Sequence, residues 1–352
     1  MRIAYVVERD LSAEDAIVKK IAAQARCWRE MGHDVTIFAL SPSDSVSSAL
    51  DGLSVVQQYR RGWLDWFSRY RKLIDEVIRR QPTCAYFRFS TYFPAVGQLM
   101  RRVPTAVEVN TDDVSEYRTS MTRRAYLYHR LTRRRLFLGC RGIVTVTQPL
   151  ADGLRAYGKP TTAVPNGIDL EQFPSLPPPD NDAPRLAFLG SPNMPWHGVD
   201  KVAKLAELNP DWRIDLIGPS ASGFNSSAPA NIHLHGYLDR DQYQPLLEKC
   251  DVAVSTLALH RNSMEDAAPL KLREYLAYGI PSIIAYRDDD FPDERPFLLR
   301  LPNTPRTVEE NIDVIRQFVE RAKNMRVPRE AIGHLDIRQK ERKRLFFLES
   351  IS

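Results

Sequence analysis

Short apolar runs and longer segments with helical periodicity follow one another along the chain. Residues 1–7 and 35–40 are apolar runs typical of buried strands, and residues 12–32 between them place apolar side chains at helical spacing. Ser12 and Asp15 are expected to open this helix as a capping box. A strand, a helix and a second strand in this order form the crossover that a parallel sheet requires.

The same alternation continues on both sides of one interruption. Further strands of the first half are expected at residues 84–90, 105–110 and 141–147, with helices at 63–80 and 123–140. Residues 170–184 are rich in proline and polar side chains, and predict a connection between domains. Beyond it the expected strands are 185–190, 212–218, 232–237, 251–256 and 281–286, with helices at 197–208, 241–250 and near 270–279.

We therefore predict an α/β protein with two domains, residues 1–170 and residues 185–335. The last segment, 336–352, reads as a basic amphipathic helix that crosses back to the first domain. A length of 352 residues and 43% hydrophobic content are enough for a core in each domain.

The composition favours a cytoplasmic protein. The N-terminal run does not resemble a secretory signal, and no apolar stretch reaches the roughly 20 residues that span a bilayer. The four cysteines show no CxxC spacing, which fits buried thiols in a reducing compartment better than zinc ligation.

Positive charge is concentrated in the first half, where residues 1–180 contain 26 Lys and Arg against 19 Asp and Glu. Aromatic side chains stand beside these cations at residues 59–80 and 123–135, a composition that suits an anionic membrane surface. A solvated helix face whose aromatics belong to the core explains the pattern equally well. Nucleic acid is not expected as a partner, because no recognition motif accompanies the charge.

The segment 265–281, EDAAPLKLREYLAYGIP, carries the most specific arrangement of charges. Pro269 is expected to open a short helix, with Lys271 in its first turn and Glu274 on the same face. The positive helix end and Lys271 suit a diphosphate, while Glu274 and Asp266 suit the hydroxyls of a ribose and a hexose. These are the groups of a nucleotide sugar. An ordinary surface helix, with Lys271 paired to Glu274 or Tyr275, is the alternative.

A second candidate position follows the strand expected at residues 105–110. Glu108, Asn110 and Asp112 lie where the carboxyl end of a parallel sheet binds ligands, and Asn110 is the candidate for the cleft. The acidic runs 112–113 and 288–290 are interpreted as solvated loop charges rather than metal sites.

Four phrases, DAAPLKLREYLAYGIP, AVPNGIDLEQF, GHDVTIF and LHGYLDRDQYQPLLEKCDVAVST, resemble glycosyltransferase family 4 in their expected order. The resemblance implies the GT-B architecture, in which two Rossmann-like domains face each other across a cleft. It also implies metal-independent transfer of a hexose, with retention, from a nucleoside diphosphate sugar to a glycan or lipid-linked acceptor, without a cofactor. Bacterial-type cell-surface polysaccharide synthesis is the expected context.

The resemblance assigns roles to particular residues. Glu274 is implied to bind the ribose, and Asp266 to bind sugar hydroxyls at a position where the family has glutamate. An Arg and a Lys six positions apart in the family correspond to Ser191 and His197, so Lys271 and Arg273 are expected to neutralise more of the diphosphate. Further implied donor contacts are Gly198, Tyr237, Leu238 and Leu270. A cap or packing role for His197, and core packing for Tyr237 and Leu238, are the alternatives.

The loop after the first strand, ERDLSAED, lacks the glycines that many family members have there. We expect Arg9, Ser12 or Glu14 to line the acceptor side instead. Two other functions remain open: a sugar-nucleotide epimerase or phosphorylase with the same fold, and a degenerate, non-catalytic protein. No GxGxxG, GxSxG or HExxH occurs, so dinucleotide oxidoreductases and common hydrolases have little support.

Overall fold

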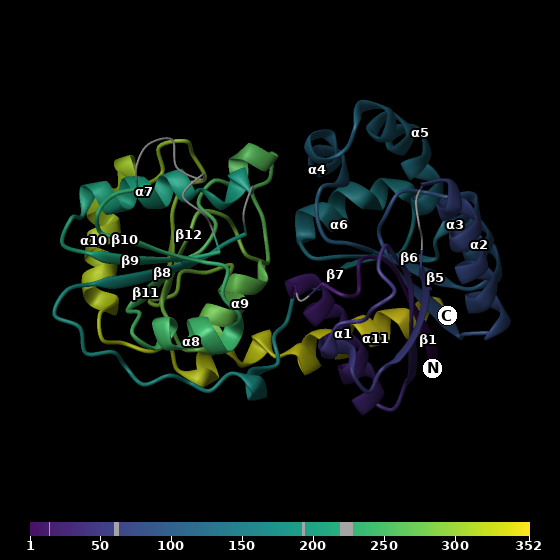
Figure 1. Cartoon of the computed structure of the whole chain (residues 1–352), viewed down its shortest axis with the longest axis horizontal. Helices are drawn as coiled ribbons and strands as arrows, with labels where there is room; N and C mark the ends of the chain where they lie inside the picture. Colours follow the sequence, from purple (N-terminus) through teal and green to yellow (C-terminus); the bar gives the residue numbers. More distant parts are fainter. Residues whose placement is uncertain (14, 60–62, 192–193, 219–227) are drawn as a thin grey trace. The chain divides into compact units, whose positions relative to one another are not determined.

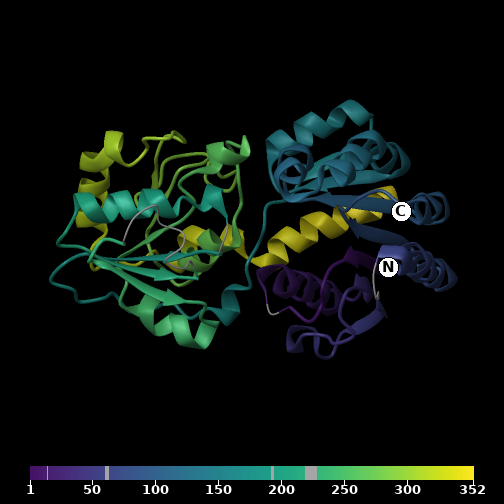
Figure 2. The ribbon, with the colours of Figure 1, turned by 45° about the horizontal axis from the view of Figure 1, so that its top comes forward.

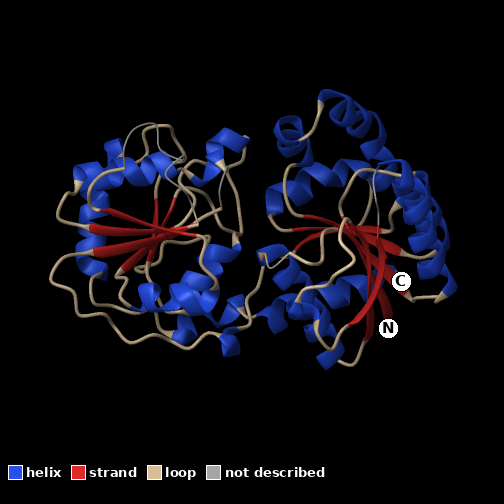
Figure 3. Ribbon diagram, in the orientation of Figure 1, coloured by secondary structure: helices blue, strands red, loops and turns tan. Residues whose placement is uncertain are grey.

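The computed structural model describes residues 1–13, 15–59, 63–191, 194–218 and 228–352 (Figure 1). The chain divides into two compact units. Unit 1 consists of residues 1–167 and 337–352, and unit 2 of residues 168–336. In each unit the strands form a central layer with helices on both faces (Figure 3).

Unit 1 contains a parallel sheet in the order β3-β2-β1-β4-β5-β6-β7. The strands are β1 (Arg2–Glu8), β2 (Asp34–Ser41), β3 (Ser54–Tyr59), β4 (Cys84–Arg88), β5 (Thr105–Val109), β6 (Gly142–Thr145) and β7 (Thr161–Ala163). The helices are α1 (Ala16–Glu30), α2 (Trp63–Arg79), α3 (Pro94–Arg102), α4 (Asp113–Ser120), α5 (Arg123–Gly139), α6 (Gln148–Leu154) and α11 (Ile337–Ile351). Helices α2, α3 and α5 share one hydrophobic core with the sheet, and α1 and α11 share the other.

Unit 2 repeats this plan with a parallel sheet in the order β10-β9-β8-β11-β12-β13. The strands are β8 (Arg185–Leu189), β9 (Arg213–Ile217), β10 (Ile232–Gly236), β11 (Val252–Val254), β12 (Ser282–Ile284) and β13 (Leu298–Arg300). The helices are α7 (Val199–Leu208), α8 (Arg240–Glu248), α9 (Leu270–Ala277) and α10 (Ile312–Ala322). Helices α8 and α9 pack on one face of the sheet, and α7 and α10 on the other.

Both sheets have the strand order of a Rossmann-like fold. Their first strands, β1 and β8, lie in the interior, and the chain builds outward in one direction before it returns to the other side. The order reverses between β1 and β4 in unit 1, and between β8 and β11 in unit 2. These are the switch points at which such sheets bind ligands, beyond the carboxyl ends of the strands. The predicted fold class of two Rossmann-like domains is confirmed.

Helix α11 belongs to unit 1, where it lies beside α1 (Figures 1 and 2). The Trp28 indole donates a hydrogen bond of 2.7 Å to the buried Glu341 carboxylate, and Arg344 pairs with the same carboxylate. The side chain of Leu348 completes the apolar contact with the sheet. Unit 1 is therefore assembled from two separate segments of the chain.

The start of α1 differs from the predicted capping box. Asp15 alone is the N-cap, and its carboxylate accepts hydrogen bonds from the backbone N–H groups of Ile17 and Val18. The Ser12 hydroxyl donates instead to Asp10 at 2.6 Å. Ser12 lies three residues before the cap, so its side chain turns back to the preceding loop.

Candidate functional site

Helix α9 is fixed at the switch point of unit 2 by one buried tyrosine. The Tyr275 hydroxyl accepts a hydrogen bond from the N–H of Leu189, at the end of β8, at 2.6 Å. It donates to the carbonyl of Val254, at the end of β11, at 3.3 Å. Helix α9 is therefore held against the carboxyl ends of these two strands. The helix begins at Leu270, with Pro269 as its N-cap rather than as its first residue.

Lys271 carries a buried ammonium group without a hydrogen-bond partner among the described residues. Its Nζ atom lies 4.6 Å from the centroid of the buried Phe188 ring. Burial lowers the pKa of Lys271 from 10.5 to about 7. The alternative pairing of Lys271 with Glu274 or Tyr275 is not present. An unsatisfied cation in this position is suited to an anionic ligand, because such a ligand restores the interactions that burial removed.

His197 lies beside this cation as a neutral hydrogen-bond donor. The backbone N–H of Ser191 donates to His197 Nδ1 at 3.2 Å, so the imidazole proton is on Nε2. Burial, and then the nearby Lys271, hold the pKa of His197 far below its ordinary value. The ring centroids of His197 and Phe188 are 6.3 Å apart. Ser191, His197 and Lys271 are thus brought together around the end of β8.

Gly198 makes this local structure possible. Its φ angle of +78° is in the left-handed region, and an added Cβ would lie 3.2 Å from the backbone nitrogen of Ala258. A side chain at position 198 would therefore strain the turn from His197 into helix α7.

The two carboxylates of the 265–281 segment have different partners. The Glu274 carboxylate accepts a hydrogen bond of 2.5 Å from the Tyr243 hydroxyl. Both oxygens of Asp266 contact the Arg287 guanidinium, at 3.0 and 3.2 Å, and Asp266 is 8% exposed. Asp266 is thus held in a defined position beside β12, not in a solvated loop.

Arg273 is not available to a diphosphate in this structure, contrary to its predicted role. It is fully buried and pairs with Asp288 at 2.6 and 2.8 Å and with Asp290 at 2.8 Å. The acidic run 288–290 is therefore not a set of solvated loop charges. Within the described ranges, no group of three or more His, Cys, Asp or Glu side chains is arranged to hold a metal ion.

The remaining residues predicted to contact the sugar donor lie at the start of α9 and after β10. Leu270 is half-buried at the start of α9, next to Lys271. Tyr237 and Leu238 follow β10, an edge strand, and Tyr237 is 73% exposed. The exposed ring of Tyr237 does not belong to the core, unlike the alternative expected from the sequence.

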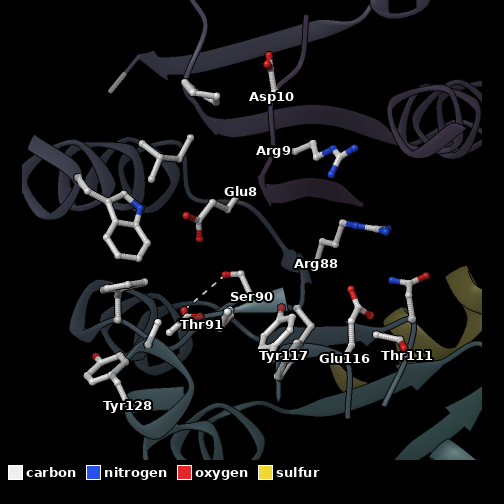
Figure 4. Close-up of a pocket in the computed structure, with 18 of the residues that line it drawn as sticks. Glu8, Arg9, Asp10, Arg88, Ser90, Thr91, Thr111, Glu116, Tyr117 and Tyr128 are labelled. Carbon is white, nitrogen blue, oxygen red and sulfur yellow. Dashed lines mark hydrogen bonds between the residues drawn. The ribbon is translucent and has the colours of Figure 1, made fainter. Parts of the chain in front are cut away.

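Unit 1 has a pocket of about 1090 Å³ beyond the carboxyl ends of β1, β4 and β5 (Figure 4). Its charged lining side chains are Glu8, Arg9, Asp10, Arg88, Glu116 and Arg124, so carboxylates and guanidinium groups are equal in number. Its aromatic lining side chains are Trp66, Phe67, Phe89, Phe93, Tyr117 and Tyr128. A pocket with balanced charges and many ring faces suits a sugar, which offers both hydroxyl groups and apolar C–H faces.

Asn110 lines this pocket, as does Arg9. The Asn110 Oδ1 atom accepts a hydrogen bond of 2.7 Å from Lys20 in α1. Arg9 forms an ion pair with Asp15. Ser12 is not among the lining residues, and Glu14 lies outside the described residues. Of the residues expected on the acceptor side, the structure places Arg9 in the pocket.

The sequence did not reveal the aromatic side of the pocket. Trp66 packs against the core residue Phe93, which agrees with the core alternative. Trp66 and Phe67, with ring centroids 3.9 and 5.4 Å from that of Phe93, also line the pocket. Phe93 lies in a short segment before α3, a helix that the sequence did not predict. The spacing of aromatics along α2 was the available signal, but it does not show which other element they meet.

The two Rossmann-like units define a protein with the GT-B fold, and solved structures of that class match nearly the whole chain. One is a lipopolysaccharide outer core galactosyltransferase, WaaB, with a TM-score of 0.69 and 10% identity over 99% of each chain. Another is WaaG, a glycosyltransferase involved in lipopolysaccharide biosynthesis, with a TM-score of 0.68 and 12% identity over 99% of each chain. A third is Alr3699/HepE of Anabaena in complex with UDP-glucose, with a TM-score of 0.63 and 12% identity over 99% of this chain and 100% of that one.

The model of Glycosyltransferase Family 4 matches residues 21–172 of the chain. This match lies mainly in unit 1, and the solved structures extend the likeness to unit 2 at the level of fold. The resemblance seen in the sequence motifs is thereby confirmed. No curated protein sequence matches the chain.

Proposed function

We propose that the protein is a retaining glycosyltransferase that moves a hexose from a nucleoside diphosphate sugar to a glycan or lipid-linked acceptor. The observation that carries the proposal is the unpartnered, buried ammonium group of Lys271 at the switch point of a Rossmann-like sheet. A diphosphate is the natural partner for that cation. The HepE complex with UDP-glucose and the lipopolysaccharide enzymes WaaB and WaaG favour a role in bacterial-type cell-surface polysaccharide synthesis.

In this proposal the donor is bound by unit 2. Lys271, the Nε2–H of His197 and the N-terminal N–H groups of α9 bind the diphosphate, with Ser191, Gly198 and Leu270 beside it. Glu274 accepts hydrogen bonds from the ribose hydroxyls, and Asp266 from hydroxyls of the hexose. Tyr237 and Leu238 contact the base.

The chemistry requires positioning and charge stabilisation rather than a protein nucleophile. The bond between the anomeric carbon and the diphosphate oxygen breaks, and an acceptor oxygen forms the new bond on the same face of the sugar. The acceptor proton passes to the departing phosphate. Lys271 and the end of α9 stabilise the negative charge that develops there, so we propose that the reaction needs no metal ion. Asn110 binds the acceptor in the pocket of unit 1.

The decisive experiment is a thermal-shift screen of UDP, GDP, ADP and their sugars. A ligand at 100 times its dissociation constant adds about 2.7 kcal/mol to the free energy of unfolding. We expect one nucleotide sugar to raise the melting temperature of the wild type and of Lys249→Met, an exposed lysine of the same unit, but not of Lys271→Met. The proposal fails if none of these ligands stabilises the wild type.

A non-catalytic protein that binds sugar nucleotides is the second candidate, because Asp266 is already paired with Arg287. The two candidates differ in their products. A transferase releases free nucleotide from the stabilising sugar nucleotide, at least slowly to water, whereas a binding protein leaves it intact. An isomeric sugar nucleotide would instead identify an epimerase, and dependence on inorganic phosphate would identify a phosphorylase.

We also propose that α5 binds an anionic membrane surface, which places the protein on the cytoplasmic face of a membrane. Leu127, Leu131 and Leu138 lie on one side of α5 and are 59%, 72% and 46% exposed. The exposed arginines on this helix are Arg123, Arg124, Arg130, Arg134 and Arg135. Apolar side chains bordered by cations suit an amphipathic helix that lies in a lipid headgroup layer. Among the described residues, no helix has the length and apolarity to span a bilayer.

A further inference from the structure

Lys20 reaches the pocket of unit 1 only through another residue. It lies in α1, and its ammonium group donates to Glu108 Oε1 at 2.9 Å and to Asn110 Oδ1 at 2.7 Å. Asn110 lines the pocket, whereas Lys20 does not. The Lys20 side chain is 8% exposed, so it is a buried group placed behind the pocket wall.

The position of Lys20 is fixed from behind by Glu108. Glu108 is fully buried in β5, and its other oxygen accepts a hydrogen bond of 3.0 Å from Arg88. Burial alone raises the Glu108 pKa, but Lys20 and Arg88 hold it well below its ordinary value, so the carboxylate stays charged. A charged carboxylate in this place retains the ammonium group of Lys20 as its partner.

A chain of polar contacts extends from Glu108 to the C-terminal helix. The Tyr5 hydroxyl lies 3.5 Å from Glu108 and donates to Gln24 at 2.9 Å. Gln24 lies 3.4 Å from Glu341 of α11. These residues come from both segments that build unit 1, and all are buried. Lys20 therefore connects this buried polar chain to Asn110, which lines the pocket.

The hydrogen-bond donor beside Asn110 is Lys20, and it decides how the Asn110 amide is oriented. A lysine ammonium group can only donate hydrogen bonds, so the Asn110 atom beside it must be the oxygen. The amide nitrogen, Nδ2, is then the polar atom that remains for the pocket. Without Lys20, the amide could rotate and offer either atom to a ligand.

We propose that Lys20 is a positioning residue, which holds the Asn110 amide so that its Nδ2 donates to an oxygen atom of the bound acceptor. The orientation of the Asn110 amide does not depend on the proposed function. Its hydrogen bond to an acceptor oxygen rests on the proposed function. The competing explanation is a purely structural role, in which Lys20 serves only as a counter-ion of Glu108. In that case Arg88, which also pairs with Glu108, would partly replace the charge of Lys20.

The orientation can be measured without any substrate. The full chain, labelled with ¹⁵N-asparagine, gives side-chain amide resonances that Asn110→Asp assigns. Burial lowers the pKa of Lys20 to about 8, against the opposing effect of Glu108. The other charged or titratable groups around it, Glu108, Arg88, Arg344 and Tyr5, keep their charge states near that pH. We expect the Asn110 amide resonance to titrate near pH 8 in the wild type and to lose this titration in Lys20→Met.

Lys19→Met is the matched control, because Lys19 is the exposed neighbour of Lys20 on the same helix. It should titrate like the wild type. If Lys20→Met retains the wild-type titration of Asn110, the positioning role is overturned. Lys20→Arg keeps a buried cation and a hydrogen-bond donor. If the Asn110 amide resonance of Lys20→Arg at pH 7 lies close to its wild-type chemical shift, the positioning role is supported even if Lys20→Met unfolds. An Asn110 resonance in Lys20→Arg that matches Lys20→Met overturns it.

The acceptor part of the proposal uses octyl β-D-glucopyranoside, galactopyranoside and mannopyranoside, each below its micellar concentration. We expect at least one glycoside to shift the Asn110 amide resonance in the wild type and in Lys19→Met. The same shift in Lys20→Met should require a several-fold higher concentration of that glycoside. Equal titrations in the wild type and Lys20→Met, or no shift with any glycoside, overturn the acceptor role. Failure of the proposed function is recognised separately, because it appears as the absence of stabilisation by sugar nucleotides at unit 2.

Discussion

The binding role proposed for Lys271 comes with a local destabilisation of the folded protein. Its ammonium group is buried and has no partner among the described residues, so the folded state gives up hydration without gaining an ion pair. Proteins commonly tolerate such groups at binding sites, where strongly shifted pKa values are concentrated. The same property allows the role of Lys271 to be tested through stability as well as through binding.

We expect Lys271→Met to raise the free energy of unfolding at pH 6 by roughly 1–3 kcal/mol, because it removes a buried charge that has no partner. The folded pKa of about 7 is below the ordinary value of 10.5, so the unfolded chain binds more protons between these two pH values. The free energy of unfolding of the wild type therefore rises with pH through this range, as the destabilisation caused by Lys271 is relieved. Urea unfolding at pH 6 and pH 9 measures the difference. A Lys271→Met protein less stable than Lys249→Met at pH 6 would contradict the prediction.

Donor binding should depend on pH in the opposite direction. A bound diphosphate favours the charged form of Lys271 and raises its pKa, so binding above pH 7 takes up a proton. We expect the affinity to fall by up to tenfold per pH unit above pH 7. Calorimetry at pH 8 in buffers of different ionisation enthalpy detects the uptake. Proton release, or equal uptake by Lys271→Met, would be inconsistent with this assignment.

Glu274 provides a second test at the residue level. We expect Glu274→Gln to weaken binding of the sugar nucleotide by about 1–3 kcal/mol, which is the usual effect of losing a hydrogen bond to a charged group. Tyr243→Phe removes the hydroxyl that donates to Glu274 but leaves the carboxylate in place, so it should have a smaller effect. Calorimetry gives the affinity of each variant for the sugar nucleotide, and the two losses are then compared. A larger loss in Tyr243→Phe would indicate that Glu274 serves to anchor α8.

The placement of a side chain was predictable where it depends on local spacing, and not where it depends on distant partners. Lys271 and Glu274 share one side of α9, which the i, i+3 spacing shows directly. Arg273 is between them in sequence but faces the interior, where Asp288 and Asp290 neutralise it. Nothing in the helix itself reveals those partners, because they arrive from the loop after β12.

At the scale of elements, the interior strands and the edge strand β10 were predictable, whereas the other three edge strands were not. Strands β1, β2 and β4 are continuous apolar runs, because both faces of a parallel sheet are covered by helices. The missed strands β3, β7 and β13 are edge strands. β3 is mixed in polarity and only partly buried, and the other two have three residues each, so none gives a clear periodic signal.

Helix α5 carries a prediction at this scale. We expect the double substitution Arg130→Gln with Arg134→Gln to weaken binding to vesicles of phosphatidylglycerol by about 2 kcal/mol, or roughly 30-fold, because each surface cation contributes about 1 kcal/mol. Arg101→Gln with Arg102→Gln removes the same charge from exposed positions at the end of α3 and should have little effect. Vesicle flotation at matched ionic strength measures both. Equal losses in the two proteins would show that net charge, rather than the face of α5, drives the attraction.

At the scale of the whole molecule, the two units differ in how the chain builds them. Unit 1 needs the distant segment 337–352, since Glu341 and Arg344 are buried in it and Leu345 and Leu348 cover the core next to α1. The amphipathic pattern of residues 337–352 predicts a helix, but not the partners of its side chains. The buried ion pair could not be predicted, because charged residues on an amphipathic helix are normally assigned to its solvated face.

Unit 2 is one continuous segment, 168–336, that contains a complete sheet with a hydrophobic core on each face. Every residue proposed to bind the donor lies within it. We therefore expect the fragment 168–336 to fold alone and to bind the sugar nucleotide with an affinity within about tenfold of that of the full chain, a difference of about 1.4 kcal/mol. Circular dichroism and calorimetry measure folding and affinity.

Two comparisons make this test specific. The same fragment with Lys271→Met should fold but not bind, which separates loss of the site from loss of the fold. The fragment 1–167 should remain unfolded until a peptide of residues 337–352 covers the apolar surface beside α1, because without it the side chains that contact Leu345 and Leu348 are exposed to water. A folded 168–336 fragment that binds no sugar nucleotide, while the full chain binds one, would show that residues outside 168–336 are required for the donor site.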